Sequence, residues 1–110
     1  MSRQQTSSGR EDWNGFNGLD KLLEHRVRLG ICVLLARHDE LAFSRLKELL
    51  EETDGSLGAH LRKLEDAGYL DVSKEFVDRK PVSWYSLTTR GQRALNSHLD
   101  ILSNLIKQSR

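Results

Sequence analysis

The apolar residues of the chain recur with helical spacing from Asp20 onward. Asp20 is a good N-cap residue, so we expect a first helix that begins at Lys21 and runs to about residue 37. The apolar side chains of this segment spread around nearly the whole circumference of the helix. A helix that is apolar on most sides is buried between other elements. The pattern therefore predicts that this first helix lies at the centre of the core.

Two shorter helices are predicted to follow. Residues 41–43 favour a short extended piece, and Ser44 is a good N-cap for a second helix that carries Leu46, Leu49 and Leu50. Thr53 or Asp54 caps a third helix over residues 54–67, which Gly68 ends. Its leucines form one apolar stripe: Leu57, Leu61 and Leu64. At about 100° per residue, the opposite face carries Gly55, Ala59, Arg62 and Asp66, with Ser56 and Lys63 beside them.

Alternating polar and apolar residues predict two strands, over 69–76 and 82–87, joined by a polar loop over 77–81. Thr88 then caps a last helix over about 88–107. Four apolar residues of this helix are spaced four, three and four residues apart: Leu95, Leu99, Leu102 and Ile106. Such a narrow seam suits pairing with the same helix of a second copy, and the alternative is that it packs on the protomer's own first helix.

Composition indicates one domain. The chain has 110 residues, of which 37% are apolar, and a single cysteine, Cys32. Residues 1–18 are polar and predict a flexible arm, whereas 19–110 form the folded domain. In the arm, Trp13 and Phe16 are expected to dock back onto the protein, or else the arm touches DNA through its arginines. No apolar run is long enough for a bilayer or a signal peptide, which predicts a cytoplasmic protein.

The net charge of +1 hides an uneven distribution. Residues 1–73 carry ten basic and thirteen acidic side chains, whereas residues 74–93 carry five basic and two acidic ones. The five cations of the second segment are Lys74, Arg79, Lys80, Arg90 and Arg93. Most of the positive charge is therefore predicted to lie on the hairpin and at the start of the last helix.

The sequence does not indicate an enzyme. The four histidines are scattered, with no metal-ligand spacing, and no glycine-rich phosphate loop follows a strand. Cys32 lies in the most apolar helix, where a buried thiol is expected. We therefore predict no catalytic residues, no metal site and no cofactor.

A binding module fits the pattern better, because two helices joined by the tight turn at residues 51–53 and followed by a basic hairpin make a helix-turn-helix with a wing. Gly55, Gly58 and Ala59 would let DNA approach the third helix closely, although glycines also permit tight helix packing. Ser56, His60, Arg62 and Lys63 are candidate donors to phosphates or base edges. Lys74, Arg79 and Lys80 are candidate contacts of the wing, although a solvated charged turn would look the same.

Three segments resemble winged-helix transcriptional regulators of the MarR, ArsR and PadR types. They are LEHRVRLGICVLLAR (23–37), LGAHLRKLEDAGYL (57–70) and YSLTTRGQRAL (85–95), and the likeness covers about residues 19–107. The resemblance implies a homodimer on a pseudo-palindromic operator, with the wing tip at residues 78–80. It also implies DNA contacts from Ser56, Ala59, His60 and Arg62 or Lys63. The paired cysteines of metal-sensing ArsR proteins are missing, which argues against metal sensing there.

These observations predict a mainly α protein with a small β-hairpin (α+β), a winged helix-turn-helix with a long C-terminal dimerisation helix. The expected function is a homodimeric repressor that binds double-stranded DNA. Two alternatives remain open. One is a subunit that binds other proteins, for instance through the acidic stretch 39–54. The other is a sensor of the same fold that binds a small-molecule effector between its dimerisation helices.

Overall fold

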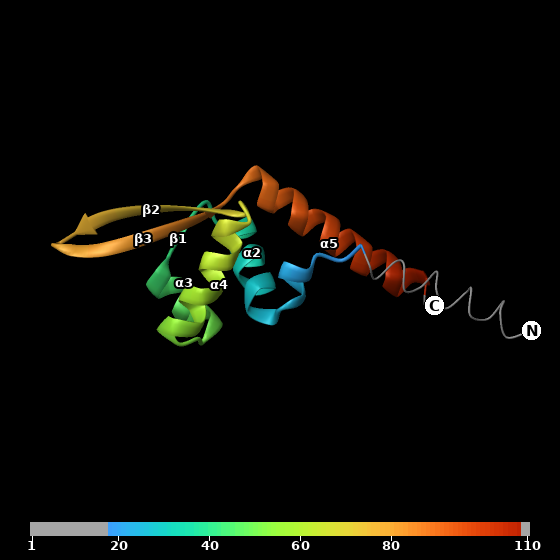
Figure 1. The fold of residues 1–110 in the computed structure, drawn as a ribbon, viewed down its shortest axis with the longest axis horizontal. Helices are drawn as coiled ribbons and strands as arrows, with labels where there is room; N and C mark the ends of the chain where they lie inside the picture. Colours follow the sequence, from blue (N-terminus) through green and yellow to red (C-terminus); the bar gives the residue numbers. More distant parts are fainter. Residues whose placement is uncertain (1–17, 109–110) are drawn as a thin grey trace, which may run out of the picture.

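The computed structural model describes residues 18–108, so the predicted arm with Trp13 and Phe16 lies outside the described residues. Helices and a small antiparallel sheet alternate along the chain (Figure 1). In order they are η1 (Lys21–Glu24), α2 (Arg26–Arg37), β1 (Leu41–Ala42), α3 (Phe43–Leu50), α4 (Asp54–Asp66), β2 (Leu70–Val77), β3 (Lys80–Leu87) and α5 (Thr89–Gln108). This arrangement confirms the α+β fold class and the predicted winged helix-turn-helix.

The first predicted helix is divided in two. Asp20 caps it as expected, since its Oδ1 accepts a bond from the Leu22 N–H at 2.9 Å. The residues that follow form a 3-10 turn, and His25 then adopts an extended conformation (φ −85°, ψ 130°). His25 Nδ1 accepts a bond from the Val27 N–H at 3.1 Å and so caps α2. Each piece therefore has its own side-chain cap, and the prediction of one continuous helix from Lys21 was wrong.

Helix α2 is the central element of the core, as its apolar pattern predicts. The buried apolar side chains come from η1, α2, α3, α4, β2 and α5: Leu23, Val27, Ile31, Cys32, Leu35, Leu46, Leu57, Leu61, Leu64, Leu70 and Leu95. Cys32 is fully buried within this cluster, and burial raises the pKa of its thiol to about 12. The thiol therefore stays protonated and acts as a small apolar group.

The second helix differs from its prediction in its start and in its stripe. It begins at Phe43, and Ala42 is its N-cap residue without a side-chain bond, so Ser44 is not the cap. Leu46 is buried, but Leu49 is 39% exposed. Glu51 (φ 53°) ends the helix in the left-handed conformation and thereby begins the turn to α4.

The three strands pair in the order β1-β3-β2, all antiparallel. The hairpin loop is shorter than predicted, because Val77 pairs with Lys80 and only Asp78 and Arg79 form the turn. Both turn residues have positive φ, 51° and 67°, which is the type I′ geometry that matches the twist of a two-residue hairpin. Pro81 lies within β3, beyond the residues that β1 pairs with, where its missing N–H breaks no bond to a second neighbour. The hairpin extends from the body as a long wing (Figure 1).

Helix α5 is fastened to the body at its N-terminus. Thr88 Oγ1 accepts a bond from the Gly91 N–H at 3.0 Å, which confirms the predicted cap, and donates to the Gly68 carbonyl at 2.6 Å. A Cβ at Gly91 would overlap the carbonyl oxygen of Tyr69, so only glycine fits there. This joint packs the start of α5 against the turn that joins α4 to β2.

A partly buried polar network fixes α5 further along its length. The Asp20 N–H donates to Nδ1 of His98, which is 3% exposed, at 3.0 Å. The Tyr69 hydroxyl donates to the Asp20 carboxylate, and burial together with this bond raises the pKa of Tyr69 to about 12. The network therefore joins α5 to η1 and to the start of β2.

The predicted seam of α5 is divided between two environments. Leu95 is 2% exposed and belongs to the protomer's own core, so its assignment to a dimer interface was wrong. Leu99 and Ile106 are 40% and 61% exposed, and Leu102 is half-buried. Figure 1 shows the second half of α5 extending away from the rest of the described residues. With 20 residues the helix is about 30 Å long.

Candidate nucleic-acid interface

Helix α4 turns one face into the core and leaves the other open. Thr53 caps it by accepting a bond from the Ser56 N–H at 3.2 Å, and its three leucines are buried. The opposite face is exposed, as its spacing predicts, and together with the residues beside it forms a shallow surface depression. The depression is lined by Asp54, Gly55, Gly58, Ala59, Arg62, Lys63 and Asp66.

The two glycines of α4 are not required by packing within the protomer. A Cβ at Gly55 or at Gly58 would meet no atom within 4 Å other than those of the adjacent residues and of the helix's own backbone. A glycine within a helix costs about 1 kcal/mol relative to alanine, so stability alone would favour alanine at both positions. The alternative that these glycines permit tight helix packing therefore fails for the described part of the protomer, and the small residues instead leave α4 accessible from outside.

His60 and Ser56, both predicted to meet DNA, are engaged inside the protomer. Nδ1 of His60 lies 3.2 Å from Nη1 of Arg28, and its ring lies 4.2 Å from the ring of His25. Burial and these two neighbours lower the pKa of His60, which favours the neutral imidazole. The Ser56 hydroxyl donates to the Glu52 carboxylate at 2.6 Å. His60 therefore links α4 to α2, and Ser56 ties the first turn of α4 to the turn before it; the spacing of the helix had not revealed either contact.

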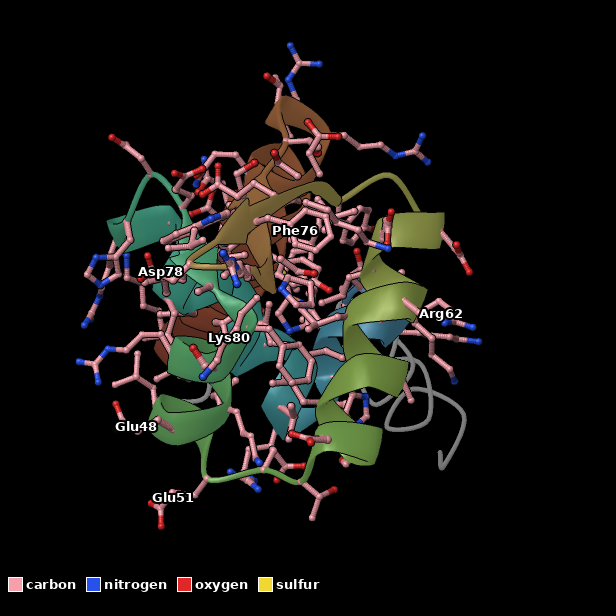
Figure 2. All side chains as sticks on the ribbon, turned by 90° about the vertical axis from the view of Figure 1, so that its left-hand side faces the viewer. Glu48, Glu51, Arg62, Phe76, Asp78 and Lys80 are labelled. Atoms are coloured by element: carbon pink, nitrogen blue, oxygen red, sulfur yellow. The ribbon has the colours of Figure 1, made fainter. Side chains whose placement is uncertain are left out.

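Arg62 and Lys63 are the exposed cations of α4. Figure 2, which views the molecule from the wing tip, shows Arg62 pointing away from the body. The carboxylates near the start of the helix have cationic neighbours: Lys47 Nζ lies 2.9 Å from Asp54, and Arg26 lies 3.7 Å from Glu52. These pairs offset negative charge beside the depression, although such exposed pairs contribute little to stability.

The wing presents its own cations. Lys74, Arg79 and Lys80 are all exposed, and the turn places Arg79 at the extreme tip. Sequence reasoning did not single out Phe76, which is 78% exposed, or its neighbour Val77, which is 44% exposed. Alternation placed Phe76 on a strand face, but only the length of the hairpin beyond the body shows that this face has no cover there. Figure 2 shows Phe76 and Lys80 on the wing, to one side of Arg62 on α4.

Residues 27–106, most of the chain, match the family model described as a winged helix DNA-binding domain. The chain belongs to this winged helix family. The family comprises transcription regulators and not enzymes, which confirms the prediction that this winged helix protein is not an enzyme. None of the helices among residues 18–108 is both long and apolar enough to cross a membrane.

The winged helix protein is 31% identical over 87 residues to an uncharacterized protein of Methanocaldococcus jannaschii, a match that covers 79% of this chain and 95% of the relative. It is similar in structure to a transcriptional regulator homologue of Pyrococcus horikoshii, with 31% identity, a TM-score of 0.74 and coverage of 79% of this chain and 86% of that one. A putative transcriptional regulator of Salmonella typhimurium gives 25% identity, a TM-score of 0.64 and coverage of 82% and 87%. MarR, at 16% identity and a TM-score of 0.70 over 84% of this chain and 66% of its own, shares the fold. These likenesses confirm the resemblance to winged-helix regulators.

Proposed function

We propose that this protein is a transcriptional repressor that binds double-stranded DNA in a sequence-specific manner, as a homodimer on a pseudo-palindromic operator. The observation that carries the proposal is the outward face of α4, where small residues that packing does not require lie beside two exposed cations. The similar Pyrococcus and Salmonella proteins, both named as transcriptional regulators, support it.

In this proposal α4 lies in the major groove. Gly55, Gly58 and Ala59 allow the helix backbone to approach the base edges, because no longer side chain keeps the duplex away. Arg62 and Lys63 donate to base edges or phosphates, and arginine suits guanine because its two N–H groups match the O6 and N7 acceptors. Lys74, Arg79 and Lys80 of the wing bind phosphates and the flanking minor groove.

The homodimer is proposed to form through the second half of α5. Leu99 is 40% exposed and Leu102 is half-buried, on a helix that extends beyond the body. A two-fold dimer presents one α4 to each half-site, and half-sites read from one face of the duplex lie about 34 Å apart. The symmetry of the operator would then follow from the symmetry of the dimer.

Selection of bound sequences from a random duplex pool, followed by gel-shift titration, tests the proposal. The double variant Arg62→Ala/Lys63→Ala is expected to bind the selected duplex at least about tenfold more weakly with an unchanged circular dichroism spectrum. The matched control is Lys21→Ala/Arg37→Ala, which removes two exposed cations outside α4, α5 and the wing and should bind like the wild type.

The salt dependence gives a second measurement. For the wild type, the logarithm of the binding constant should fall linearly with the logarithm of the salt concentration. The reason is that counterions leave the DNA for each phosphate that the protein binds. Equal affinity of the wild type and the α4 variant, or a flat salt dependence, would refute the assignment of α4. A protein that retains no duplex from the pool but captures a defined protein partner would instead be a protein-binding subunit.

A further inference from the structure

The wing carries an aromatic side chain that the fold leaves uncovered. Phe76 is 78% exposed, and it pairs across the hairpin with Pro81, also exposed, one position before the pair that closes the turn. A phenylalanine exposed to this degree loses the free energy of burial, about 1.5–3 kcal/mol, that it would gain in a core or a complex. A ring in this position points to a contact made outside the protomer.

The strand geometry places this ring on a defined side. Phe76 shares a strand face with Leu70, which is 2% exposed and packs in the core with the leucines of α4. At about 3.3 Å per residue, Phe76 lies about 20 Å further along the strand, beyond the body. The ring therefore leaves the wing on the side where β2 meets α4, which is the side that a duplex seated on α4 would occupy.

The surroundings of Phe76 suit nucleic acid. Lys74 lies on the same strand face two residues before Phe76, and Arg79 lies in the adjacent turn. Lys80 and Glu75 lie on the opposite strand face, where Glu75 accepts a bond from Trp84 Nε1 at 2.8 Å. The exposed apolar patch on this face of the wing tip consists of Phe76 and Pro81 alone among the described residues. A stable protein interface buries about 800 Å² on each partner, so the tip is too narrow for such docking but fits a groove.

We propose that Phe76, backed by Pro81, acts as a wedge that enters the minor groove beside the half-site, partly unstacks one base step and bends the duplex. This inference rests on the proposed function. Proteins that bend DNA from the minor groove use apolar side chains in this way, with arginine and lysine holding the neighbouring backbone. Flexible pyrimidine–purine steps are the preferred points of insertion because they unstack most easily. The wing then adds sequence preference outside the bases that α4 reads.

The test uses the full-length protein and a duplex selected by the wild type. One copy of the duplex carries 2-aminopurine at the flanking step, and another carries a donor and an acceptor dye at its two ends. Wild-type protein should raise the 2-aminopurine fluorescence and increase energy transfer between the ends. Phe76→Ala should lose both signals and bind about tenfold more weakly, whereas Phe76→Leu should retain the bend because leucine is also an apolar wedge.

Val77→Ala is the matched control, since Val77 is also exposed, is adjacent in sequence and lies on the opposite face of the strand. It should keep both signals. Wild-type binding without either signal, or equal signals from the wild type and Phe76→Ala, would overturn the wedge and leave the proposed function intact. Failure of the wild type to bind any duplex would overturn both.

Discussion

The turn at the wing tip predicts a substitution that stabilises the hairpin and weakens binding at once. Arg79 has φ 67°, in the left-handed region, where the conformation costs a residue with a Cβ about 1–2 kcal/mol. Glycine avoids that cost but loses about 0.5–1 kcal/mol through its greater freedom in the unfolded chain. Arg79→Gly creates an Asp-Gly turn, the favoured type I′ sequence, and should stabilise the hairpin by about 0.5–1 kcal/mol.

Hydrogen exchange is the appropriate assay, because the tip lies beyond the body and amides exchange through local opening of the hydrogen bonds that protect them. The amides of Val77 and Lys80 should exchange about two- to fivefold more slowly in Arg79→Gly, the factor that corresponds to the free energy above. Binding of the selected duplex should weaken, and the slope of log K against log salt should fall by about 0.9 for each phosphate that the variant no longer binds.

Two control variants separate strain from charge. Arg79→Asn tolerates the left-handed conformation without the cation and should resemble Arg79→Gly in both assays. Arg79→Lys keeps both the charge and the strain and should resemble the wild type. Faster exchange in Arg79→Gly, or an unchanged salt slope, would refute the reasoning that this position holds a strained residue for the sake of its charge.

Three further predictions concern packing, pH and assembly. Gly91→Ala should lower the free energy of unfolding by about 1–3 kcal/mol in chemical denaturation, because its Cβ would overlap the Tyr69 carbonyl; an unchanged midpoint would contradict this. Because the pKa of His60 is lowered in the fold, the unfolded chain takes up a proton first, so stability should fall as the pH drops through about 6.5 and below, and His60→Gln should weaken that dependence. Leu99→Asp should shift sedimentation towards the monomer and weaken DNA binding in parallel, and a dimer of undiminished affinity would count against the α5 interface.

Most of the helix caps and stops, which depend on a few neighbouring residues, were predicted from the sequence, although the caps of α2 and α3 were not. The caps Asp20, Thr53 and Thr88 and the stop at Gly68 all depend on a few neighbouring residues, and all are found. The break at His25 was missed because a histidine that accepts the N–H two residues later leaves no signal in the apolar spacing. The length of the hairpin loop was overestimated, because the turn residues Asp78 and Arg79 lack the glycine that normally marks a type I′ turn.

The candidate site was predictable as a face but not as a set of contacts. Helical spacing identifies the outward side of α4, where Arg62 lies. It cannot show that His60 meets Arg28 or that Ser56 donates to Glu52, because those partners come from α2 and from the preceding turn. Leu95 on α5 is a similar case. The apolar spacing of one helix does not show which of its residues are already covered by the protomer's own core.

The hydrogen bonds among Asp20, Tyr69 and His98 bear on the distance between the two DNA-binding bodies of the proposed dimer. This network holds α5 against η1 and the base of the wing, which would fix the proposed interface on α5 relative to the proposed DNA-binding body. In the proposed dimer, the protein would then set the distance between the two α4 helices, and with it the spacing of the half-sites that it binds. Removing the bond to α5, for instance with His98→Leu, should let the protein accept operators whose half-sites differ in spacing by a base pair or more.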